Sequence, residues 1–103
     1  MCDFEEKLKS LETTLSEFEQ EILADPKSAF NRQACDFKKG EVRQEVNNAQ
    51  KIMAQAVKEI HTQPEQAHVL LVCAQRFFEA AVDMTREYDR VHKFVSSKGS
   101  HIH

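Results

Sequence analysis

Hydrophobic residues recur every three or four positions along most of the chain, which is the spacing of an amphipathic helix. The first stripe fills the N-terminal segment and comprises Met1, Phe4, Leu8, Leu11, Leu15, Phe18 and Ile22. Its steps alternate between three and four residues without a miss, as in the heptad seam of a coiled coil. Asp3 and Glu6 fit an N-cap with its capping-box acid. The pattern predicts a helix from about Asp3 to Leu23.

A second stripe follows the segment ADPKS, where Pro26 behind an Asp25 cap indicates a new helix start. Its regular part comprises Val42, Val46, Ala49, Met53, Ala56 and Ile60. Gly40 interrupts this segment, and a glycine inside a helix costs about 1 kcal/mol relative to alanine. Because no second helix-breaking residue accompanies Gly40, we expect one long helix, straight or bent, that ends near His61. A true break at Gly40 would instead give a compact four-helix bundle.

The third stripe opens with TQPE, in which Thr62 and Glu65 match a capping box and Pro64 suits the first helical turn. Its main seam comprises Ala67, Leu70, Ala74, Phe77, Ala81, Met84, Tyr88, Val91 and Val95. The pattern predicts a helix that ends near Ser97, ahead of Gly99. Residues 1–97 are therefore expected to form a single helical domain, and residues 98–103 a flexible tail.

These three stripes predict an all-α fold. Only 2 Gly and 2 Pro occur in 103 residues, and this argues against an all-β fold with its many turns. Three helices with short connections must run up, down and up. Residues 3–21 hold seven acids and two bases, whereas residues 27–59 hold seven bases and four acids, so the first two helices attract each other. We expect an antiparallel bundle with coiled-coil-like packing, a long hairpin and a shorter N-terminal helix.

Composition excludes several classes of protein. The net charge of −3 excludes a globally basic nucleic-acid binder. No apolar run approaches the roughly 20 residues of a membrane-spanning helix. The charged N-terminus MCDFEEKLKS lacks the apolar region of a secretory signal, which favours a cytoplasmic protein. Cys2, Cys35 and Cys73 are odd in number and far apart, so we expect reduced thiols, with Cys35 and Cys73 packing as small hydrophobic residues.

The expected lengths of the helices leave one end of the hairpin uncovered. The hairpin would be about 50 Å long and the first helix about 30 Å. The first helix would then reach back only to the region of Asn47 and cover the third helix from about Arg76 onward. Beyond that point the third helix is apolar nearly all round, and such a helix favours burial on every side. The predicted partner-binding residues at this end are Ile52, Met53, Val57, Ile60, Val69, Leu71, Val72 and Phe78.

These features favour a non-enzymatic protein–protein interaction module, such as a small adaptor, chaperone or complex subunit. Its expected partner is a second copy of the chain or another helical protein, and no cofactor, metal or small-molecule substrate is expected.

The alternative is a signalling or metal-binding bundle centred on His68. The run AHVLL resembles the phospho-accepting helix of histidine phosphotransfer domains, although Leu71 and Val72 stand where that family has a lysine and a small residue. Residues 65–68 also form a Glu-x-x-His motif like those of di-iron bundles, which require two such motifs.

Overall fold

The computed structural model describes residues 2–88, of which 84% are helical, with no strand among them. This confirms the predicted all-α fold class. The elements are α1 (Cys2–Phe18), the π-helical turn η1 (Glu19–Leu23), α2 (Ala29–Gln33), α3 (Asp36–Glu59) and α4 (Pro64–Thr85).

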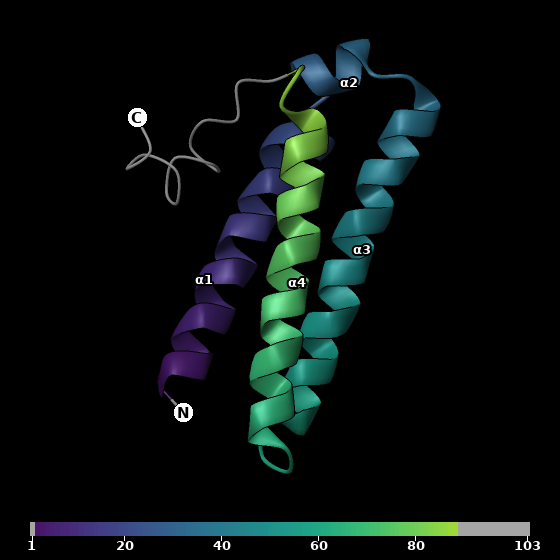
Figure 1. Ribbon diagram of the computed structural model, residues 1–103. Coiled ribbons are helices and arrows are strands. Elements are labelled where there is room, and N and C mark those ends of the chain that lie inside the picture. Colours follow the sequence, from purple (N-terminus) through teal and green to yellow (C-terminus); the bar gives the residue numbers. More distant parts are fainter. Residues whose placement is uncertain (1, 89–103) are drawn as a thin grey trace, which may run out of the picture.

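The three long helices run up, down and up, as the stripes predict (Figure 1). α3 and α4 form an antiparallel hairpin, and α1 runs in the same direction as α4. The rings of Phe18 in α1 and Phe78 in α4 meet edge to face, with 5.5 Å between their centroids. α4 therefore packs against both of the other long helices.

Small side chains line the contact between α3 and α4. Ala49 and Ala56 of α3, and Ala67, Ala74 and Ala81 of α4, are completely buried. Within each helix these alanines are seven residues apart, so they lie in one row. Because side-chain size at the contact sets the distance between two helix axes, rows of alanine favour a close approach.

The connection between α1 and α3 differs from the predicted single long helix. The chain forms the short helix α2, becomes extended at Ala34 and Cys35 with ψ of 145° and 165°, and then enters α3. Gly40 lies inside α3, so the alternative prediction of a helix break at Gly40 is also wrong. At Ala34 and Cys35 φ is −74° and −77°, values open to any residue. The break therefore needs neither glycine nor proline.

This break makes the three long helices nearly equal in length. α3 has 24 residues and α4 has 22, which correspond to about 36 and 33 Å. α1 with η1 spans residues 2–23 and is also about 33 Å long. Phe4, only 2% exposed, reaches His68 near the start of α4, with 5.4 Å between the ring centroids. The first helix has nearly the predicted length, whereas the predicted 50 Å hairpin with an uncovered end is wrong.

Side chains from two later helices bind the carbonyl groups at the end of η1. Asn31 Nδ2 donates to the Leu23 carbonyl at 2.8 Å, and the Ser28 hydroxyl donates to the Ile22 carbonyl at 2.8 Å. From α3, Arg43 Nη2 donates to the Leu23 carbonyl at 3.1 Å. Because the last carbonyl groups of a helix have no partner within it, these bonds replace the missing ones and fix the corner.

The starts of two helices differ locally from those predicted. Asp3 lies inside the first turn of α1 rather than at its N-cap. Pro64 lies in the first turn of α4, as predicted, but the N-cap residue is Gln63 rather than Thr62 and makes no side-chain cap bond. The predicted capping box of residues 62–65 therefore does not form.

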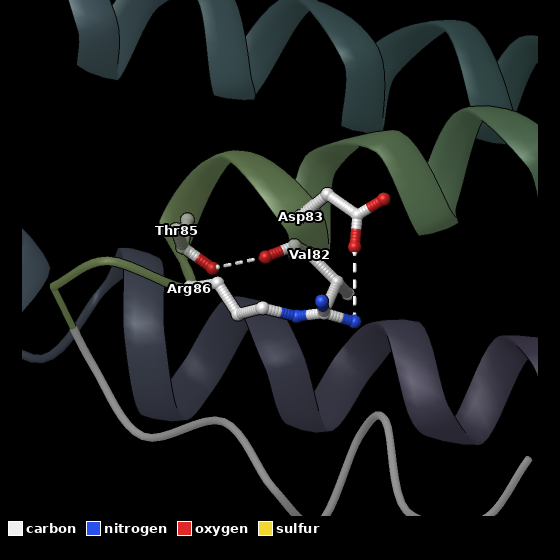
Figure 2. Close-up of polar contacts among 4 residues, drawn as sticks. All are labelled: Val82, Asp83, Thr85 and Arg86. Atoms are coloured by element: carbon white, nitrogen blue, oxygen red, sulfur yellow. Dashed lines mark hydrogen bonds and ion pairs between the residues drawn. The ribbon is translucent and has the colours of Figure 1, made fainter. Parts of the chain in front are cut away.

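α4 ends at Thr85, well before the predicted end near residue 97. Figure 2 shows the Thr85 hydroxyl donating to the Val82 carbonyl at 2.9 Å and Arg86 paired with Asp83 at 3.2 Å. The backbone N–H of Arg86 also donates to the Asp83 carbonyl, which tightens the last turn. Residues 89–103, including the rest of the predicted helix and the tail, lie outside the described residues.

Gly40→Ala is expected to stabilise the fold by about 1 kcal/mol, because alanine is the better helix former. A Cβ added at Gly40 would meet no atom within 4 Å, so the added methyl group costs no packing energy. Thermal unfolding followed by circular dichroism should show a midpoint about 4–8 °C higher. A lower midpoint would mean that the glycine is needed for a bend in α3.

Ala74→Leu is expected to destabilise the protein by about 1–3 kcal/mol, because a larger side chain forces α3 and α4 apart. The matched control is Ala24→Leu, which makes the same change at an exposed position at the end of η1 and should alter stability by less than about 0.5 kcal/mol. Urea denaturation of the two variants measures the difference. Equal effects would contradict a close alanine contact.

Candidate partner-binding groove

Half of the predicted partner-binding residues belong to the core of the chain itself. Met53, Ile60, Leu71 and Phe78 are all buried. α1 covers that end of the hairpin, because its residue Phe4 packs against His68 near the start of α4. The prediction that these four residues lie on a partner-binding surface is therefore wrong.

The other four predicted residues do not form one patch. Val69 and Val72 are 55% and 53% exposed and lie one turn apart on α4. Val57 is 45% exposed and faces a groove between α3 and α1. Ile52 is half-buried and lies five residues before Val57, which places it about 140° around the same helix.

The groove that contains Val57 has a volume of about 320 Å³. Its residues come from α1 and η1 on one side and from α3 on the other: Glu12, Leu15, Ser16, Glu19, Gln50, Met53, Ala54 and Val57. Leu15 and Met53 are buried and form its apolar floor. Ser16 and Ala54 are exposed, and because both are small they leave the space open.

The charge on the groove is one-sided. Glu12 and Glu19 stand on the α1 side, seven residues apart and so on one face of the helix. Gln50 Nε2 in α3 donates to Glu19 Oε2 at 3.3 Å and links the two walls. The lining holds no basic side chain. The groove therefore combines an apolar floor with an acidic edge, which suits a polypeptide better than a small molecule that needs several converging polar groups.

His68 contacts one group within α4 and one in α1. Its Nδ1 lies 2.8 Å from the Pro64 carbonyl, one turn earlier in α4, and its ring packs against the edge of Phe4. Among residues 2–88, no three His, Cys, Asp or Glu side chains are grouped so that they could hold a metal ion.

The two described cysteines are free thiols, as expected, but neither is packed as a hydrophobic residue. Cys35 is exposed at the N-cap of α3, and Cys73 is exposed on α4 beside Val72. Near Cys35, Tyr88 packs on Phe30 with 5.5 Å between the ring centroids. Desolvation, reinforced by the Glu87 carboxylate, raises the pKa of the Tyr88 hydroxyl.

The sequence-based prediction missed most of the groove because it considered only large apolar residues. Ser16, Ala54 and Gln50 give no hydrophobic signal, yet the first two shape the groove and the third links its walls. A usable signal was present. Ser16 directly follows the buried Leu15, and Ala54 directly follows the buried Met53, so each helix carries a small residue beside its seam.

No protein-family model, curated protein or solved structure matches this chain. Within the part of the chain that the structure describes, no helix is long and apolar enough to cross a membrane.

Leu71→Asp is expected to cost more than the about 2–5 kcal/mol that truncation of a buried leucine costs, because it also places a charge in the core. Val72→Asp changes the adjacent residue, whose side chain points outward, and should cost less than about 0.5 kcal/mol. Urea denaturation followed by circular dichroism compares the two variants. Similar stabilities would show that Leu71 lies on the surface after all.

Proposed function

We propose that this protein is a non-enzymatic, cytoplasmic protein–protein interaction module that binds a helical surface of its partner over the α1–α3 groove. The observation that carries this proposal is the groove itself, in which an apolar floor lies open between α1 and α3. An amphipathic helix laid into such a groove is a recurrent mode of protein recognition, in which the apolar face of the helix contacts the floor.

Several features of the groove support a helix as its occupant. Ser16 and Ala54 are small and allow helices of a partner to approach the two walls closely. Val57 offers an exposed apolar side chain beside the floor formed by Leu15 and Met53. A docked helix would bury these groups without any change in the fold.

The alternative centred on His68 has weaker support. Its ring contacts the Pro64 carbonyl within α4 and packs against Phe4 of α1. The groove is formed by other residues and does not include His68.

A photo-crosslinking amino acid that carries benzophenone tests this proposal in cells of the native host. Placed at position 54, it faces the groove and is expected to crosslink to a second polypeptide. Placed at position 55, about 100° around α3, it faces away and should give no such product. Adding Val57→Asp should abolish the product at position 54, because a charge then enters the apolar contact.

The product would be detected as a band of increased mass on a denaturing gel. Equal crosslinking from positions 54 and 55, or none from either, would contradict a docking role for the groove.

A further inference from the structure

We propose that the occupant of the α1–α3 groove is the same face of a second copy of this chain, in a two-fold symmetric dimer. This inference rests on the proposed function and names the partner for the same site. It follows from the charges on the two walls of the groove and from the register between them.

The α1 side of this face carries three acidic residues, with Lys9 on the same flank between the first two of them. Glu12 and Glu19 line the groove, and Glu5 lies a further seven residues earlier, so all three fall on one flank of the helix. The row spans about 21 Å.

The α3 side carries basic residues with the same spacing. Lys51 and Lys58 are exposed and seven residues apart. Each lies near the small residue Ala54, three residues after Lys51 and four before Lys58, which is the spacing of neighbours on one helix surface. Lys51 and Lys58 thus flank the outer edge of the groove, just beyond its lining residues.

The hydrogen bond between Gln50 and Glu19 shows that these two residues lie at about the same height on the two helices. Lys51 follows Gln50 directly, so it stands at nearly the height of Glu19. α1 and α3 are antiparallel, so moving backward along α1 and moving forward along α3 lead in the same direction. Glu12 is seven residues before Glu19, and Lys58 is seven residues after Lys51. Lys58 therefore stands at the height of Glu12.

A two-fold axis parallel to the helices converts this register into contacts between copies. Rotation about such an axis places α1 of one copy opposite α3 of the other without a change in height. Glu19 and Glu12 then face the partner's Lys51 and the partner's Lys58, and symmetry repeats both pairs. An isologous interface requires this self-complementarity of one face.

The centre of the interface would be apolar and closely packed. Ser16 and Ala54 are small, so the two faces can approach, and Val57 of each copy can bury its exposed surface in the other's groove. Two adjacent helices about 33 Å long and 10–12 Å wide present about 700 Å² per copy. That is close to the roughly 800 Å² per partner of a standard stable interface.

Charge reversal tests this arrangement with the purified full chain in sedimentation-equilibrium experiments. The wild type is expected to sediment at twice the mass of the monomer. Glu12→Lys with Glu19→Lys makes both walls basic, and Lys51→Glu with Lys58→Glu makes both walls acidic. Each double variant should weaken dimerisation about hundredfold, because four attractions become repulsions.

The sharpest result comes from an equimolar mixture of the two double variants. In a mixed dimer every basic wall meets an acidic one, so the mixture should form heterodimers although neither variant dimerises alone. The quadruple variant, with both pairs exchanged in one chain, should dimerise again. Glu6→Lys with Glu17→Lys is the matched control. It adds the same charge on a different flank of α1 and should leave the dimer intact.

Three results would overturn the dimer: a wild type that stays monomeric, double variants that dimerise normally, or a mixture that does not associate. A monomeric purified chain that still crosslinks from position 54 to a different protein in cells would reject the dimer and leave the proposed function standing. The absence of both signals would reject both.

Discussion

The close contact between α3 and α4 is the constraint on which the rest of the molecule depends. Its rows of alanine, from Ala49 to Ala81, bring the two helices together along their length. Because alanines occupy the line of contact with α3, the larger side chains of α4, such as Leu71 and Phe78, lie beside that line and need other residues to bury them. Phe78 is covered by α1, where its ring meets Phe18 edge to face. The position of α1 is thus set by what the hairpin leaves unburied.

The corner between α1 and α3 decides whether that cover is complete. α2 and the extended residues Ala34 and Cys35 use up the length that would otherwise prolong α3. The hairpin becomes as long as α1, and Phe4 reaches the start of α4. Ser28, Asn31 and Arg43 hold this corner through carbonyl groups at the end of η1. The interruption of the helix at Ala34 and Cys35 therefore leads to burial of the apolar surface that a single long helix would expose.

Three helices around one core still leave a face between α1 and α3, away from α4. The groove on this face is formed as much by the small Ser16 and Ala54 as by the apolar floor beneath them. Its charges are divided, with glutamates along α1 and lysines along the edge of α3. A face that carries both signs in matched register is suited to its own copy, whereas a face of one sign would require a different partner. This is the physical basis for both the proposed function and the proposed dimer.

The sequence by itself determined the all-α class, the three long helices and their up-down-up order, because a continuous three-four hydrophobic spacing is compatible only with helices. It also placed Pro64 correctly in the first turn of α4. Only the tertiary structure decided where the second segment breaks, because Ala34 and Cys35 are extended with ordinary φ values and carry no local signal. That interruption sets the length of α3, and the relative lengths of the helices decide which side chains are buried. Leu71 and Val72 are both aliphatic neighbours in sequence, yet one is core and the other surface, since burial depends on which face α1 covers. The groove, too, was decided only by the tertiary structure, because its walls are far apart in the chain and come together only in the folded bundle.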